Sequence, residues 1–223
     1  MKLRRWVDKQ KVFYKNNQTK YISYVEEFSK INKTHIWLGG SFLHGNDTIF
    51  SDVDISVFCD AKILNKLIYG YGKPIYISYT SNPPGILIVI YIDGVAVDLE
   101  VIKKVNITKN EYFHRSEIKK IDYTRDNNIC RQFAFSNKTE YQISRLFHRS
   151  LIKFLSGKAD ISISTMNEIL IFMNSQDFID ESNYKSKFPN ILNDFHKRFG
   201  LPILYHNLLC TLLNTKIWKI KNI

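Results

Sequence analysis

Two aspartates separated by a single residue, Asp52 and Asp54, lie in a stretch that alternates between polar and apolar side chains. This alternation, over residues 52–58, is typical of a half-buried β-strand. Side chains two residues apart on a strand project to the same side, about 6.6 Å apart along it. Carboxylates suit Mg²⁺, and two such ions about 3.5–4 Å apart bind the attacking and leaving oxygens of a phosphoryl transfer. The spacing therefore predicts a site for two magnesium ions.

The segment before these aspartates is rich in glycine. Gly39, Gly40 and Ser41 directly follow the apolar run at residues 35–38, which reads as a strand. Two consecutive residues without a Cβ let the backbone approach a ligand closely. If a helix begins there, its free N–H groups favour a phosphate. The segment therefore predicts a phosphate-binding turn beside the two aspartates.

A later strand carries two further carboxylates. Residues 86–92 and 95–102 are β-rich runs separated by the dipeptide Asp93–Gly94, which indicates an antiparallel hairpin with a two-residue turn. In the second run, Asp98 and Glu100 share the face opposite the apolar side chains. Either residue can supply a third carboxylate to the metal site.

The segment at residues 39–54 resembles the signature of the polymerase-beta-like nucleotidyltransferases, most closely that of the minimal branch and of the branch that modifies aminoglycoside and lincosamide antibiotics. That signature is a Gly-Ser pair, a glycine four residues after the serine, and Ser-Asp-x-Asp. Many small members carry Arg or Lys where this chain has Phe42, Leu43 and His44. The resemblance covers roughly residues 35–102. The matching positions are Gly40, Ser41, Gly45, Ser51, Asp52 and Asp54.

In that family the glycine-serine turn holds the triphosphate of the nucleotide, and the two aspartates bind metal. A third carboxylate on a neighbouring strand completes the metal site or accepts a proton, and Asp98, between Val97 and Leu99, matches its apolar-Asp-apolar context. The resemblance thus implies catalytic metal ligands at Asp52, Asp54 and Asp98. It implies nucleotide contacts at Gly40, Ser41 and Ser51.

From about residue 140 onward, apolar residues recur every three or four positions, which predicts helices. On the first of these helices, Arg145, Arg149 and Lys153 form one basic stripe. The resemblance implies that Lys153 contacts the triphosphate, and a solvated basic face is the alternative. The expected helices cover residues 140–157, 164–174, 189–199 and 202–219.

These patterns predict an α/β (α+β) fold with two domains. A mixed-sheet nucleotidyltransferase domain is expected over residues 1–105, with amphipathic helices near residues 21–31 and 61–69. A mostly helical domain is expected over residues 106–223, although residues 106–138 are polar and show no clear periodicity.

The resemblance implies an enzyme, a magnesium-dependent transferase that moves a nucleoside monophosphate from a nucleoside triphosphate such as ATP onto a hydroxyl group. A small-molecule acceptor of the antibiotic type is the first choice, which implies antibiotic resistance. A transferase acting on RNA, tRNA or protein is the second choice. A catalytically silent nucleotide-binding module is an alternative of a different class, and the presence of all three aspartates argues against it.

The composition limits the setting of this chemistry. A formal net charge of +11 is compatible with nucleic acid, with an anionic ligand, or with a lysine-rich composition alone. The three cysteines are scattered, which fits free thiols in a reducing compartment. The longest apolar run, residues 86–92, is far shorter than the roughly 20 residues that cross a bilayer. No secretory signal is recognisable, so a cytoplasmic protein without membrane contact is expected.

Overall fold

The computed structural model describes residues 16–48, 50–81, 83–107, 111–116, 118 and 123–213. The chain divides into two compact units between Asn137 and Lys138. The sequence-based boundary after residue 105 lies inside the first unit, which we call the sheet unit. The division comes later because two short strands and a helix after residue 105 pack on the sheet.

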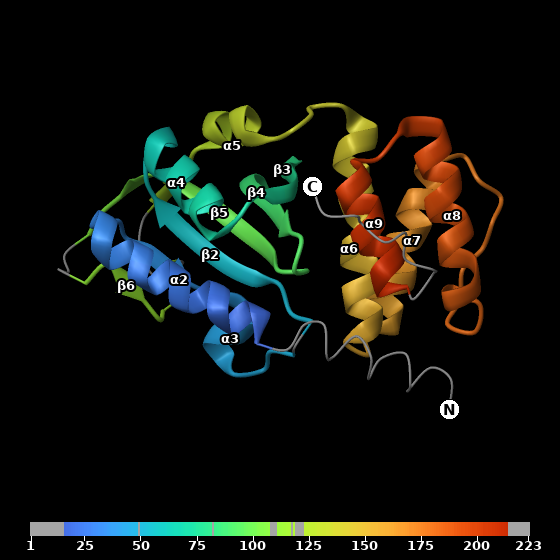
Figure 1. Ribbon diagram of the computed structural model, residues 1–223, viewed down its shortest axis with the longest axis horizontal. Helices are drawn as coiled ribbons and strands as arrows, with labels where there is room; N and C mark the ends of the chain where they lie inside the picture. Colours follow the sequence, from blue (N-terminus) through green and yellow to red (C-terminus); the bar gives the residue numbers. More distant parts are fainter. Residues whose placement is uncertain are drawn as a thin grey trace. The chain divides into compact units, whose positions relative to one another are not determined.

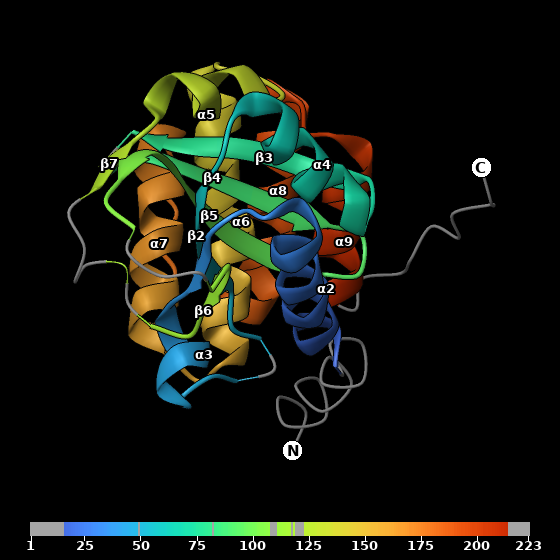
Figure 2. The ribbon, with the colours of Figure 1, turned by 90° about the vertical axis from the view of Figure 1, so that its left-hand side faces the viewer.

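A mixed seven-stranded sheet forms the sheet unit, as the sequence predicted for the fold class. The strand order is β3-β4-β5-β2-β1-β6, and β7 pairs with β5. Figure 2 shows β3, β4 and β5 side by side in that order. β2 is parallel to β5 and β1 to β6, whereas the other neighbouring strands are antiparallel. The strands are β1 (Ile36–Leu38), β2 (Val53–Phe58), β3 (Pro74–Ser81), β4 (Pro84–Tyr91), β5 (Ala96–Val105), β6 (Phe113–His114) and β7 (Tyr123–Arg125).

Three helices cover one face of this sheet, and a short helix follows β1 (Figure 1). The predicted helical spacing in α2 is confirmed, because Tyr21, Val25 and Phe28 are buried in one core with the apolar side chains of β2 and β5. Leu64 of α4 and Cys130 of α5 join the same core. The helices are α2 (Asn17–Asn32), α3 (Gly40–His44), α4 (Ala61–Tyr71) and α5 (Asn127–Phe133).

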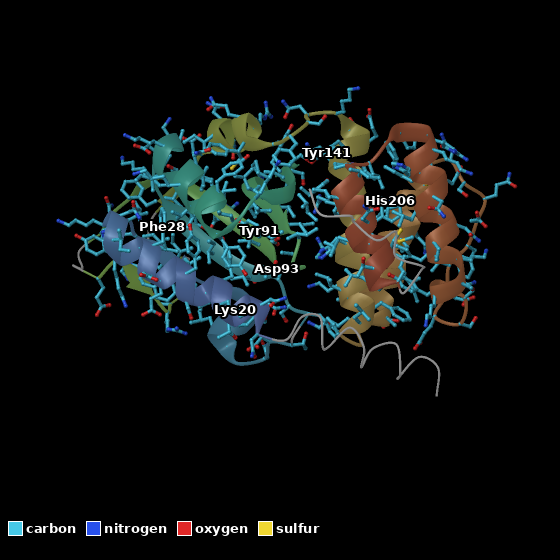
Figure 3. The ribbon with its side chains drawn as sticks, viewed as in Figure 1. Lys20, Phe28, Tyr91, Asp93, Tyr141 and His206 are labelled. Carbon is cyan, nitrogen blue, oxygen red and sulfur yellow. The ribbon has the colours of Figure 1, made fainter. Side chains whose placement is uncertain are left out.

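The hairpin between β4 and β5 is confirmed, but its turn is longer than predicted. The N–H of Gly94 donates to the carbonyl of Tyr91 (3.0 Å), and the N–H of Tyr91 donates to the carbonyl of Val95 (2.9 Å). The loop therefore holds three residues, with Gly94 at φ +83° after the turn, a common hairpin connection. Tyr91 and Asp93 lie close together at this end of the hairpin (Figure 3). The Asp93 carboxylate accepts a hydrogen bond from the hydroxyl of Tyr71 (2.7 Å).

The second unit is helical, as expected, and we call it the helical unit. Phe147 packs against Phe188 and Phe195, with ring centroids 5.6 and 5.2 Å away. The predicted third helix begins earlier than expected, so that Pro189 lies inside it and not in its first turn. Residues 214–219 of the predicted last helix lie outside the described residues. The helices are α6 (Thr139–Leu155), α7 (Ala159–Phe172), α8 (Tyr184–Phe199) and α9 (Ile203–Leu212).

Among the residues that the structure describes, no helix is long and apolar enough to cross a membrane.

Candidate functional site

The two central strands of the sheet each have one apolar and one polar face. Val53, Ile55 and Val57 of β2 are 0–2% exposed and belong to the core under the helices. The residues between them point to the opposite face, and β5 alternates in the same way. Because β2 and β5 are parallel and in register, Asp54 pairs with Asp98. These two carboxylates, the carboxylate pair, lie side by side on strands that are typically about 4.8 Å apart.

Residues in register form two rows across the uncovered face of the sheet. The first, which we call the aspartate row, contains the carboxylate pair with Ile88 on one side and Gly39 on the other; the N–H of Gly39 donates to the Asp54 carbonyl (2.9 Å). The second row, the glutamate row, lies two residues later on β2 and β5 and two residues earlier on the antiparallel strands β1 and β4. It contains Ile86, Glu100, Ser56 and Trp37.

A pocket of about 340 Å³ lies over these rows. The described residues that line it all belong to the sheet unit, and they include side chains of β7 and of the segment before it. Its volume is within the usual range of small-molecule sites, roughly 300–1,000 Å³. The described lining residues are Trp37, Gly39, Gly40, Asp54, Ile55, Ser56, Ile86, Asp98, Glu100, Ser116, Ile118, Tyr123 and Arg125.

Gly40 is in direct contact with the first of the paired carboxylates. Its φ is +60°, and a Cβ at this position would overlap Oδ2 of Asp54 and come within 2.5 Å of its Cγ. The sequence predicted a close backbone approach to a ligand at this turn. The structure shows a close approach to Asp54 itself, so the glycine is needed to leave room for the carboxylate.

Two other residues of the predicted phosphate-binding segment do not line the pocket. Ser41 lies on α3, which spans five residues, so few peptide dipoles align and the helix end contributes little field. Ser51 closes the loop before β2: its Oγ accepts from the N–H of Thr48 (2.9 Å), and its own N–H donates to the Thr48 carbonyl (2.9 Å).

Asp52 is half-buried and directly precedes β2, which begins at Val53. Strand alternation therefore does not set its direction, and it is not among the described residues of the pocket wall. In the described part of the chain, no three His, Cys, Asp or Glu side chains gather so that they could hold a metal ion. The described residues thus supply two neighbouring carboxylates, which are ligands of the type that a divalent cation such as Mg²⁺ prefers, but no third acidic, His or Cys side chain beside them.

Glu100 is buried, with 9% of its surface exposed, and its carboxylate is bound on several sides. It accepts hydrogen bonds from the Oγ of Ser56 (2.6 Å), from the hydroxyl of Tyr123 (3.1 Å) and from Nε of Arg125. Burying a carboxylate is costly unless such partners satisfy it. Glu100 therefore differs from the half-buried Asp98, although the sequence placed both on one face.

Sequence reasoning missed Tyr123 and Arg125, because their strand has three residues and lies in a polar stretch without periodicity. Burial acts to lower the pKa of Arg125, but the hydrogen bond and the charge of Glu100 raise this pKa above its ordinary value. Burial and the Glu100 charge raise the pKa of Tyr123. Arg125 therefore stays charged beside the pocket.

Aromatic rings stack on Trp37, the residue of the glutamate row that lies on β1. The ring of Trp37 lies 4.7 Å from that of His114, at an interplanar angle of 18°. His114 also contacts His35, with 3.1 Å between Nε2 and Nδ1. Trp37 is 2% exposed, so the stack fixes the wall of the pocket.

The basic stripe lies on α6 of the helical unit, as the sequence predicted. Arg149 is exposed, whereas Arg145 and Lys153 are half-buried. Lys153 therefore belongs to a different unit from the carboxylate pair.

Net charge is unevenly distributed along the chain. Residues 16–137 contain 14 Lys and Arg against 13 Asp and Glu, and residues 138–213 contain nine against seven. Residues 1–15 contain six Lys and Arg against one Asp, and residues 214–223 contain three Lys and no acidic residue. Most of the net charge of +11 is therefore carried by the two ends of the sequence.

No protein-family model matches the chain, and a search of curated proteins found no match.

Proposed function

We propose that this protein is a magnesium-dependent nucleotidyltransferase. It would transfer a nucleoside monophosphate from a nucleoside triphosphate to a hydroxyl group of a small acceptor and release pyrophosphate. The observation that carries the proposal is the pairing of Asp54 with Asp98 on adjacent parallel strands, with Gly40 against Asp54 and a pocket above them.

Asp54 and Asp98 would hold the metal, and Asp52, two residues before Asp54, is the proposed third ligand. Magnesium, when bound, neutralises charge that develops on the phosphate oxygens. The role of the protein is then to orient the two reactants and to keep its polar groups fixed around them, which contributes most of the rate in phosphoryl transfer.

The proposed reaction is a displacement at the α-phosphorus of the nucleotide. The acceptor oxygen forms a bond to the α-phosphorus, and the bond from this phosphorus to the bridging oxygen of the β-phosphate breaks. Pyrophosphate leaves with that electron pair, and the hydroxyl proton passes to the carboxylate of Asp98. We assign this role to Asp98, which pairs in register with Asp54, and not to Glu100, whose carboxylate holds Ser56, Tyr123 and Arg125 in place.

Two observations support a small acceptor over RNA. The pocket of about 340 Å³ is of the size that holds a small molecule. Residues 16–137 and 138–213 are each nearly balanced in charge, whereas a groove that follows an RNA backbone is usually strongly basic. Transfer to RNA, tRNA or protein remains the second candidate, because the ends of the sequence are basic.

The test is a matrix of the four nucleoside triphosphates against aminoglycoside, lincosamide, RNA and protein acceptors, with Mg²⁺. We expect pyrophosphate release together with a small acceptor that gains the mass of one nucleoside monophosphate. Asp54→Asn serves as the inactive control. The absence of product from every combination would contradict the proposal, and so would normal turnover by Asp54→Asn.

RNA binding is tested separately through its dependence on salt. For single strands, log–log plots of affinity against salt have a slope of about −0.7 per neutralised phosphate. We expect weak RNA binding that disappears at physiological salt, while nucleotide binding with Mg²⁺ persists. Sub-micromolar RNA binding at physiological salt would favour the second candidate.

The proposed triphosphate contact of Lys153 is tested by Lys153→Ala. This substitution should raise the KM for the nucleotide with every acceptor, whereas loss of a contact to RNA would weaken only binding of the polymer.

A further inference from the structure

Arg125 is held in place by contacts that the proposed reaction does not use. Its Nε donates to Glu100, which in turn accepts from Ser56 and Tyr123. This pairing offsets the cost of burying the two charges. Arg125 also makes a hydrogen bond with the side chain of Tyr123. These contacts use part of a planar guanidinium that carries five N–H donors in all. The terminal nitrogens of such a fork are suited to phosphate oxygens.

The backbone of β4 makes room for the stem of this arginine. A Cβ at Gly85 would lie 2.7 Å from Cβ of Arg125 and 3.1 Å from its Cδ. It would also lie 2.6 Å from Oδ1 of Asn127. Gly85 has φ +86°, a conformation that other residues rarely adopt. Glycine adopts this conformation without strain and leaves room for the stem of Arg125.

The guanidinium lies near the carboxylate pair but in the next row. Glu100 follows Asp98 by two residues on β5, which corresponds to about 6.6 Å along the strand. The carboxylate pair and Arg125 line the same pocket, so a phosphate bound beside the carboxylate pair would share that pocket with the guanidinium. Among the described residues that line the pocket, Arg125 is the cationic one.

We propose that Arg125 binds a phosphate group of the substrate in this pocket, and that Glu100 and Gly85 are the residues that position it. The inference deepens the proposed function and rests on it in one respect: the phosphate belongs either to the nucleotide or to a phosphorylated acceptor. Holding the guanidinium in advance reduces the entropy that binding would otherwise cost.

The direct test measures binding of inorganic pyrophosphate to the full-length protein by calorimetry, with Mg²⁺ present. Arg125→Met should weaken this binding by about tenfold or more, the factor expected for a hydrogen bond between charged groups. Arg131→Met is the matched control, because Arg131 is exposed on α5 of the same unit and lies 5.8 Å from the ring of Tyr79. Equal affinities of the two variants would overturn the proposal.

A second variant separates a phosphate contact from a structural ion pair. Glu100→Gln keeps a side-chain oxygen that accepts from Arg125 but removes the charge that pairs with it, so pyrophosphate affinity should fall, and by less than in Arg125→Met. The double variant Arg125→Met/Glu100→Gln removes both charges and should recover the stability that Arg125→Met loses. Recovery of stability without recovery of binding supports the proposal. Recovery of both would show that Arg125 only maintains the fold.

A third variant tests the positioning by Gly85. Gly85→Ala should reduce pyrophosphate affinity although Arg125 is still present, because the added Cβ displaces the arginine stem. Gly45→Ala is its control: Gly45 also has a positive φ, and a Cβ there meets nothing within 4 Å. Unchanged affinity in folded Gly85→Ala would overturn this part of the proposal.

The transfer assay identifies the source of the phosphate. If Arg125→Met raises the KM for the nucleotide, the nucleotide supplies it; if it raises only the KM for a phosphorylated acceptor, the acceptor does. Transfer by the wild type with no effect of Arg125→Met would overturn this inference alone. Arg125-dependent pyrophosphate binding without transfer to any acceptor would overturn the proposed function and leave this inference standing.

Discussion

The two faces of β2 and β5 differ in what their side chains do. On the core face, Val97, Leu99 and Val101 of β5 are fully buried and belong to one apolar cluster with residues of α2 and α4. On the pocket face, the residues between them are carboxylates and a serine, in register across the strands. Strand alternation separates the two roles by a single residue. Substitutions on one face should therefore change stability, and substitutions on the other should change activity.

Within the pocket face, the two rows differ in a similar way. The carboxylate of Glu100 is fixed by three donors, whereas Asp54 lies beside the backbone of Gly40 and the pocket. With three donors bound to it, the Glu100 carboxylate stabilises the side chains around it. The Glu100 carboxylate thus stabilises the pocket wall, and the aspartate row is the one to which we assign the proposed chemistry.

The largest effect is expected from Asp54→Asn. It removes a metal-ligand charge worth several kcal/mol in the transition state, so transfer should fall by about 10³-fold or more. The melting temperature should stay close to that of the wild type, because Asp54 lies outside the apolar core. Initial rates and circular dichroism melts measure the two quantities, and a large loss of stability would break the separation between the faces.

Asp98→Asn should lower the turnover rate by about 10²–10⁴, the usual effect of losing a general base. Glu100→Gln should cost less activity and more stability, because Glu100 holds three hydrogen bonds at a buried position. Steady-state kinetics and urea unfolding of the two variants provide the comparison. The reverse ranking in activity would assign the proposed role of Asp98 to Glu100.

Leu99→Ala tests the core face at the residue between these two carboxylates. Leu99 is 0% exposed, so its truncation should destabilise the protein by about 2–5 kcal/mol. The turnover rate per folded molecule should change little. Urea unfolding and rates measured well below the unfolding midpoint check both statements. A selective loss of turnover in folded protein would mean that the two faces are coupled.

Gly40→Ala and Gly45→Ala form a matched pair. Both residues have positive φ, 60° and 67°, so alanine should destabilise the protein by about 1 kcal/mol at Gly45 and by more at Gly40, where the added Cβ also overlaps Asp54. Only Gly40 lies against Asp54, and only its replacement should lower the rate, by at least about tenfold. The rate ratio of the two variants is the measurement, and a ratio near one would remove the proposed role of Gly40.

The smallest effect concerns pH. Burial lowers the pKa of His35 below its ordinary value of 6.5, although a hydrogen bond to the backbone of Glu111 opposes the shift. The unfolded chain therefore binds more protons below that pH, so the stability present above about pH 6.5 should be lost as the pH falls from there through the lower pKa of the folded state. Unfolding by urea between pH 5.5 and 7.5 should show a flatter profile for His35→Phe than for the wild type. Identical pH profiles of the two proteins would show that the pKa of His35 does not differ between the folded and unfolded states.

The sequence alone determined which residues share a face of a strand. Alternation placed Val53 and Leu99 in the core and Asp54 and Asp98 outside it, because a side-chain period of two depends on local geometry only. Helical spacing, the hairpin and the close approach at Gly40 were equally local. The core faces, the helical spacing and the hairpin hold in the structure, with a turn one residue longer than expected and earlier starts for α7 and α8. Asp52 instead precedes β2, and Gly40 closely approaches Asp54 where a ligand was expected.

Only the tertiary structure decided which of these residues meet. The pairing of Asp54 with Asp98 joins parallel strands that are far apart in sequence, and no local pattern sets such a register. The same is true of Glu100, whose burial depends on Arg125 from a three-residue strand that adds to the sheet after residue 105. A short strand stabilised by its neighbours leaves no periodic signal of its own. The position of the domain boundary and the residues of the pocket wall therefore depend on strand pairing in the tertiary structure.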